Sequence, residues 1–82
     1  MKTKTSIRFF YKVPVRARWD EQDMSWWYVA TDLISAFTES SNPRIYWNTL
    51  KKRNPELSAI CKQLKITASD GKRYNTDCLK ED

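Results

Sequence analysis

A chain of 82 residues is long enough for one small domain with a modest hydrophobic core. Hydrophobic residues make up 40% of it, which excludes an intrinsically disordered segment, and no run approaches the roughly 20 apolar residues of a membrane-spanning helix. The formal net charge of +5 favours an anionic partner, whether nucleic acid, a membrane surface or an acidic protein, without choosing among them.

The sequence lacks the residues that several kinds of catalytic or metal site need. Two cysteines and no histidine cannot form an ordinary four-ligand zinc site within one chain. The sequence offers no His as a general base, no glycine-rich phosphate loop, and no Ser or Cys with an evident base. We therefore expect neither catalysis nor a cofactor. The N-terminus also lacks the roughly 7–15-residue apolar region of a signal peptide, so we expect a cytoplasmic protein with free thiols and no membrane attachment.

The N-terminal third is typical of strands. Residues 1–6 are polar and are expected to be frayed. Residues 7–11 are rich in strand formers and are expected to pair or pack. Residues 13–19 alternate with a period of two, as in a half-buried strand, and residues 26–30 form a second aromatic and β-branched run. A polar connection separates these two runs, which predicts a hairpin with a longer loop.

Three helices are expected next. Thr31 is placed as the N-cap of a short, largely buried helix over residues 32–37. Asn42 and Pro43 are the cap and first residue of a second helix, over residues 43–53. Asn54 and Pro55 repeat this device for a third helix, whose core-facing stripe would consist of Leu57, Ile60, Cys61 and Leu64. Cys61 in that stripe is expected to be a small buried hydrophobe rather than a reactive thiol.

The C-terminal part predicts a second hairpin, over residues 64–76. Its turn contains Asp70 and Gly71, and Asp-Gly is a strong turn signal because Gly accepts a positive φ. Thr76 and Asp77 are typical of a further helix start. We therefore predict one small α+β domain over residues 1–82, with an N-terminal β-hairpin, two to three short helices and a C-terminal β-hairpin.

The helix predicted over residues 43–53 has two different faces. The arc expected to face a core holds Tyr46, Trp47 and Leu50. The other arc holds Arg44, Asn48, Lys51 and Lys52. No acid lies within this helix, which favours a surface that meets something anionic over the plain alternative of a solvated helix face.

If the partner is nucleic acid, Lys and Arg must replace counterions along its phosphates. The candidate binding residues are Arg44, Asn48, Lys51, Lys52, Arg53, Arg16 and Arg18. Of these, Arg16 and Arg18 form a basic pair on the outer side of the alternating strand, and Asn48 is able to read an adenine edge in a major groove. A solvent-facing or capping role is the alternative for Asn48. A third basic pair, Lys72 and Arg73, ranks lowest because lysines at loop tips usually serve solubility.

The role of the tryptophan side chains in this sequence can be interpreted in two ways. Exposed Trp side chains stack on unpaired bases in single-strand binders. Core packing across a hairpin is the commoner role of aromatic strand residues. We expect Trp47 in the core, and leave either Trp26 or Trp27 as an exposed platform.

Three pieces of the chain, in their order and spacing, resemble the N-terminal domain of the BRO family, found in phage antirepressor-like proteins and large DNA viruses. They are the aromatic strand that leads into an Asp-start helix (residues 26–33), Asn-Pro-Arg followed by Tyr-Trp (residues 42–47), and Asp-Gly-Lys with Tyr74, Thr76 and Asp77. The resemblance covers roughly residues 7–77 and implies an α+β fold, a DNA-binding or transcription-regulating role and no catalytic motif. Family members usually continue into more helix and often a second domain, so we expect an excised piece or a short stand-alone member.

The predicted function is therefore that of a DNA-binding, transcription-regulatory domain of the phage or prophage antirepressor type, which contacts DNA through the basic helix. The alternative is a protein-interaction module that binds a repressor or another partner through an edge strand or an exposed Trp. A homodimer is left open.

Overall fold

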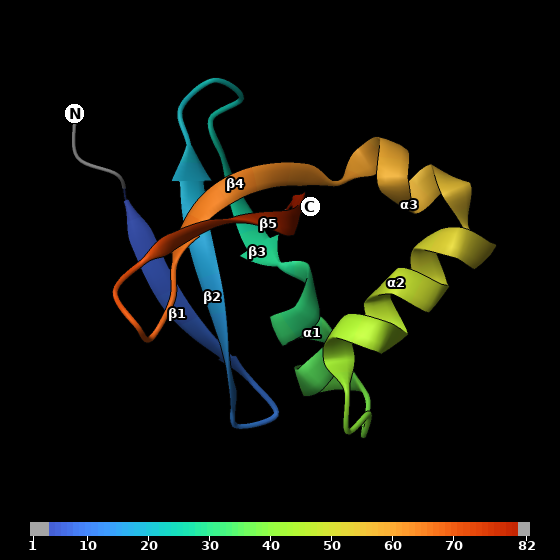
Figure 1. The fold of residues 1–82 in the computed structure, drawn as a ribbon. Helices are drawn as coiled ribbons and strands as arrows, with labels where there is room; N and C mark the ends of the chain where they lie inside the picture. Colours follow the sequence, from blue (N-terminus) through green and yellow to red (C-terminus); the bar gives the residue numbers. More distant parts are fainter. Residues whose placement is uncertain (1–3, 81–82) are drawn as a thin grey trace.

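The computed structural model describes residues 4–80, which form a five-stranded antiparallel sheet and three helices (Figure 1). The strands are β1 (Thr5–Phe10), β2 (Val13–Asp20), β3 (Ser25–Val29), β4 (Lys62–Thr67) and β5 (Arg73–Lys80). The helices are α1 (Ala30–Phe37), α2 (Pro43–Arg53) and α3 (Pro55–Ile60). The strand order in the sheet is β1-β2-β3-β5-β4. The predicted α+β class and both predicted hairpins are confirmed, and β1 is an additional strand.

The strand β1 joins β2 through a two-residue turn, Tyr11 and Lys12, whose φ angles are 51° and 67°. Positive φ at both positions belongs to a type I′ turn, which closes a hairpin because its twist matches that of the strands. Because Thr5 and Ser6 lie in β1, the expectation of a frayed N-terminus is wrong for them. Residues 1–3 of that prediction lie outside the described residues.

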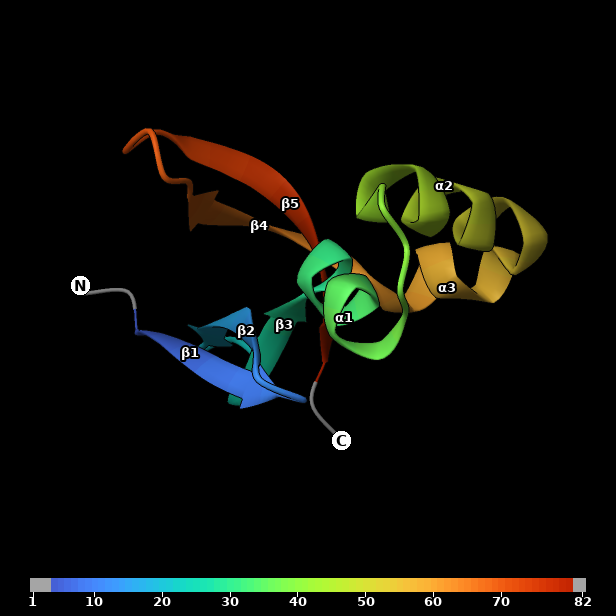
Figure 2. The same ribbon diagram turned by 90° about the horizontal axis from the view of Figure 1, so that it is seen from below.

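The sheet is strongly coiled. Figure 2 shows β1, β2 and β3 in one layer, with the β4–β5 hairpin rising away from it and the helices grouped at the other side. The layers are joined where β3 pairs with β5. A second link is made by Arg18 on β2, whose Nη1 donates to the carbonyl oxygen of Lys65 on β4 at 2.8 Å.

The core consists of two clusters, one on each side of β3. The cluster beneath α1 holds Val15, Ala17, Tyr28 and Ala36. The cluster toward the β4–β5 hairpin holds Trp27, Val29, Ile66 and Cys78. Because both faces of β3 are covered, its sequence is continuously aromatic and β-branched, while β2 buries only Val15 and Ala17 of the predicted alternation.

Two predicted helix boundaries are wrong. The helix α1 begins at Ala30, and its N-cap is Val29 rather than Thr31, because β3 runs directly into the helix without a loop. The helix α3 ends at Ile60, which is 58% exposed, and Leu64 lies in β4. The predicted helical stripe therefore does not form, because pairing with β5 overrides the local spacing.

The predicted helix start at Thr76 and Asp77 is also wrong, because both residues lie within β5. Within the described residues, no helix combines the length and the apolar character needed to cross a membrane.

Candidate functional site

Local sequence signals fix both ends of α2. The side-chain oxygen of Asn42 accepts from the backbone N–H of Ile45 at 3.3 Å, and Pro43 is the first helical residue, as predicted. At the other end, the side-chain amide of Asn54 donates to the carbonyl oxygen of Leu50 at 3.2 Å. Asn54 therefore caps the C-terminus of α2 and makes no side-chain cap for α3, contrary to the prediction.

One carboxylate anchors α2 to the sheet. Asp77 on β5 accepts from Trp47 Nε1 at 2.8 Å and from Lys51 Nζ at 2.7 Å through the same oxygen, Oδ2. Its other oxygen accepts from Gln63 Nε2 at 3.1 Å. Burial opposes ionisation of Asp77, but the three donors together outweigh burial and lower its pKa. Asp77 thus fixes which side of α2 faces outward.

The anchor confirms Trp47 in the core, at 3% exposure, and leaves most of α2 in solvent. Seven of its eleven residues are exposed, including Tyr46 at 42%, so the prediction that Tyr46 faces the core is wrong. The reason is that the buried arc is centred on Trp47, with Leu50 and Lys51 half-buried on its two sides.

The candidate residues of α2 have three different surroundings. Arg44, Asn48 and Lys52 are exposed on one side of the helix. Lys51 pairs with Asp77, so the expected absence of a compensating acid holds within the helix but fails in the fold. Arg53 is exposed about 180° away from Arg44, since nine steps of about 100° separate them.

The two candidate arginines of β2 hold the fold together. Arg16 forms a two-pronged ion pair with Asp32 of α1, with Nε–Oδ2 and Nη2–Oδ1 distances of 2.8 and 3.0 Å. This pair raises the pKa of Arg16. The guanidinium of Arg18 donates to the Lys65 carbonyl and has its Nε buried without a hydrogen-bond partner. The prediction that these side chains stand on an outer face is therefore wrong for Arg18, whereas Arg16 keeps 41% of its side chain exposed while it pairs with Asp32.

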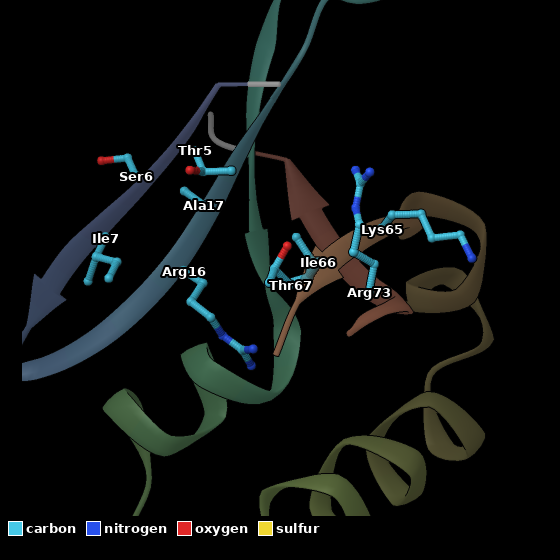
Figure 3. A pocket seen from close by; sticks show the side chains of 9 residues that line it. All are labelled: Thr5, Ser6, Ile7, Arg16, Ala17, Lys65, Ile66, Thr67 and Arg73. Carbon is cyan, nitrogen blue, oxygen red and sulfur yellow. The ribbon is translucent and has the colours of Figure 1, made fainter. Parts of the chain in front are cut away.

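Three hollows, each sharing lining residues with the next, lead from the sheet along α2 to α3. The first, of about 700 Å³, separates β1 and β2 from the β4–β5 hairpin (Figure 3). The second, of about 550 Å³, lies between α2 and β5 and shares Arg16 and Ile66 with the first. The third, of about 520 Å³, runs beside α2 and shares Asn48 and Lys51 with the second. Together we call them the groove.

The groove is rich in cations and poor in acids. Its cationic lining residues are Arg16, Arg44, Lys51, Lys52, Lys65 and Arg73. Among the described residues that line it, Asp77 is the one acid. Pairing with Asp32 and Asp77 neutralises Arg16 and Lys51. The other four cations form no salt bridge with an acid of residues 4–80, so the groove has an excess positive charge.

Sequence reasoning overlooked Lys65 and ranked Arg73 lowest. Both come to the groove because the β4–β5 hairpin folds over β2, which no spacing in the sequence reveals (Figure 3). The tryptophan platform is reduced to Trp26, because Trp27 is buried and donates to Asp23. The guanidinium of Arg8 stands over the Trp26 ring, 5.2 Å from its centroid.

No three His, Cys, Asp or Glu side chains of residues 4–80 gather in a way that suits a metal ion. Comparison with known proteins finds no matching family model, no similar curated protein and no similar solved structure.

Proposed function

We propose that this chain is a DNA-binding, transcription-regulatory domain of the BRO N-terminal type, which contacts DNA through the exposed side of α2 and the adjoining groove. The observation that carries the proposal is the unneutralised side of α2 that holds Arg44, Asn48 and Lys52. The resemblance of residues 26–33 and 42–47 to that family gives independent support from the sequence.

The shape of α2 suits a DNA duplex. Its eleven residues span about 16 Å, and with side chains a helix measures about 10–12 Å across, which the roughly 12 Å major groove admits. Asp77 and Trp47 hold the adjoining side of the helix against the sheet, and Arg44 and Lys52 stay exposed, so an approaching duplex meets these two cations without disturbing the core. These cations would replace counterions on phosphates, and Asn48 between them would face base edges.

Such a regulator acts in the cytoplasm. The described chain contains two free cysteines, Cys61 and Cys78, which suit a reducing compartment.

Charge reversal on the two sides of α2 tests the proposal. Lys52→Glu and Arg53→Glu change the net charge equally, at exposed positions on different sides of one helix. We expect Lys52→Glu to weaken binding to a fluorescently labelled 20-base-pair duplex about tenfold or more, equivalent to about 1.4 kcal/mol. Arg53→Glu should change the affinity less than about threefold, because its charge stands away from the duplex.

Fluorescence anisotropy at one fixed salt concentration gives both affinities, and circular dichroism checks that each variant is folded. Equal losses of affinity in the two variants would mean that binding depends on net charge and not on a specific side of α2. An unchanged affinity in Lys52→Glu would contradict the proposal that α2 contacts DNA.

A further inference from the structure

The edges of the sheet are β1 and β4, and they differ in how far their outer backbone groups are occupied. Near the end of β4, the backbone N–H of Ala68 donates to the carbonyl of Lys72 at 2.8 Å, and hydrogen-bonded pairs alternate along an antiparallel ladder. In the observed register, the backbone groups of Lys65 therefore turn outward. Arg18 already donates to that carbonyl at 2.8 Å, and a lysine at an edge discourages pairing with another chain.

The outer backbone groups of β1 belong to Thr5, Ile7 and Phe9. The backbone N–H of Trp19 donates to the carbonyl of Lys4 at 3.0 Å, which makes these two residues a hydrogen-bonded pair of the β1–β2 ladder. Every second residue of β1, from Ser6 onward, therefore turns its backbone groups toward β2, and the residues between turn theirs outward. No strand within residues 4–80 pairs with these outward groups.

The side chains of these three outward residues form an exposed, uncharged strip. They share one face of the sheet because side chains alternate along a strand. Ile7 and Phe9 are 60% and 69% exposed, and Ile7 is exposed although it lines the first hollow, so the β4–β5 hairpin leaves this edge open (Figure 3). A bare apolar edge of this kind invites pairing with another chain.

The two cations of this segment stand away from the edge. Arg8 lies on the other face of β1, where its Nη1 donates to the hydroxyl of Tyr28 at 2.7 Å and its guanidinium stands 5.2 Å from the ring centroid of Trp26. Lys4 Nζ stands 5.5 Å from the ring centroid of Trp19. These aromatic residues lie on β2 and β3, so both charges are drawn inward over the sheet. A second copy of this chain, which carries the same charge of +5, therefore meets no cation on the outward strip, whereas an acidic partner finds none to pair with.

We propose that β1 pairs in antiparallel orientation with β1 of a second copy of this chain, about a two-fold axis at Ile7. Ile7 then stands opposite Ile7 of the second copy, and Thr5 stands opposite Phe9 in both directions, as the symmetry of such an interface requires. All three outward residues form hydrogen-bonded pairs in this register, and the apolar side chains of both copies meet on one face. On the other face Arg8 stands opposite Ser6, so no like charges are directly opposed.

The pairing joins the sheets of two copies into one continuous sheet. Because the contact is confined to a six-residue strand, the dimer is weak and its population rises with protein concentration. The inference concerns the association of the chain with itself, so it does not depend on the proposed contact with DNA.

Sedimentation velocity of the full chain without DNA, from micromolar to millimolar concentration, and amide hydrogen exchange by NMR test the proposal together. We expect a monomer–dimer equilibrium and, as the dimer forms, protection of the amides of Thr5, Ile7 and Phe9. The amides of Ser6 and Arg8 should change little because they already pair with β2. A monomer at every concentration overturns the proposal, and so does a dimer that leaves the outward amides unprotected.

A charge swap at the two-fold axis tests the register. Ile7→Lys brings two ammonium groups face to face and Ile7→Glu brings two carboxylates, so each variant alone should dimerise about tenfold less tightly, equivalent to about 1.4 kcal/mol. A mixture of the two variants should associate again, because opposite charges then meet. Ile45→Lys is the matched control, since it makes the same change on α2 at a residue that is 61% exposed, and it should dimerise like the unaltered chain.

A mixture that associates no more tightly than either variant alone refutes the pairing, and so does an equal loss in Ile45→Lys. Circular dichroism checks that each variant is folded. If a variant at Ile7 fails to fold, the exchange pattern of the unaltered chain decides the question alone.

Discussion

Replacing Asp77 by Ala removes the acceptor that joins α2 to the sheet. Its carboxylate accepts from Trp47, Lys51 and Gln63, at 2.8, 2.7 and 3.1 Å. In the variant the Trp47 indole N–H loses its acceptor in a site that is 3% exposed, and the Lys51 ammonium loses its counter-charge. The helix that carries the candidate DNA contacts is thereby loosened from β5.

The two losses differ in size. A buried donor left without an acceptor costs about 1–3 kcal/mol. The ion pair is partly exposed, with 25% and 15% of the Lys51 and Asp77 side chains accessible, so water screens it and it contributes about 0–1 kcal/mol. The sum is about 1–4 kcal/mol, and each kcal/mol lowers Tm by about 4–8 °C in a domain of this size.

Thermal unfolding followed by near-ultraviolet circular dichroism measures this loss, because the signal depends on packed aromatic side chains such as Trp47. Lys51→Ala removes the ion pair and the ammonium that stands 5.6 Å from the Trp47 ring centroid, but it keeps the indole hydrogen bond, so it should lower Tm by no more than about 4–8 °C, equivalent to about 1 kcal/mol. Glu39→Ala, at an exposed loop position, should leave Tm unchanged. If Asp77→Ala is no less stable than Lys51→Ala, the buried indole hydrogen bond does not hold α2 in place and the reasoning fails.

Four further outcomes are expected. Asn42→Ala should lower the free energy of unfolding by about 1 kcal/mol, seen as a lower denaturant midpoint with an unchanged m value, because α2 loses its cap; an unaltered midpoint contradicts this. Replacing Gly71, whose φ is 83°, by Ala should lower the free energy of unfolding by about 1 kcal/mol. Replacement by Asn should lower it less, because Asn adopts positive φ more easily, and equal losses would contradict this backbone explanation. Burial raises the pKa of Cys78 to about 12, so iodoacetamide at pH 8 should label Cys61 first, as followed by mass spectrometry, and equal rates in the folded protein would be inconsistent with that burial. The donors around Asp77 lower its pKa, so the stability that this carboxylate gives is present above the ordinary carboxyl pKa of about 4 and is lost as the pH falls below it. Between pH 5 and pH 3, the Tm of Asp77→Asn should therefore fall by less than the Tm of the unaltered chain.

The features that sequence predicted correctly have local causes. Asn42 and Pro43 form the start of α2 by themselves, because cap and proline act within one turn. The turn at Gly71 likewise needs only its own φ. The α+β class followed from the order of such local signals.

The features that sequence missed depend on residues far apart in the chain. Leu64 and Asp77 each match a helical pattern, yet they lie in β4 and β5 because these strands pair with each other. The β1–β2 turn carries Tyr11 and Lys12 in place of the Asn or Gly that marks such turns. The sequence therefore does not predict that residues 7–11 pair with the next strand.

The site shows the same division between local and distant causes. The exposed side of α2 was predicted because Arg44, Asn48 and Lys52 lie within one helix. The neutralisation of Lys51 depends on Asp77, 26 positions later, which only the fold brings near.

The dependence of DNA affinity on salt tests most directly whether the exposed side of α2 contacts phosphates. Each phosphate contact contributes about 0.9 to the slope of log K against log salt. Lys52→Ala should therefore make the slope shallower by about 0.9, and Arg53→Ala, on another side of the same helix, should leave it as it is in the unaltered chain. An unchanged slope in Lys52→Ala, or the same reduction in both variants, would contradict the proposed interface.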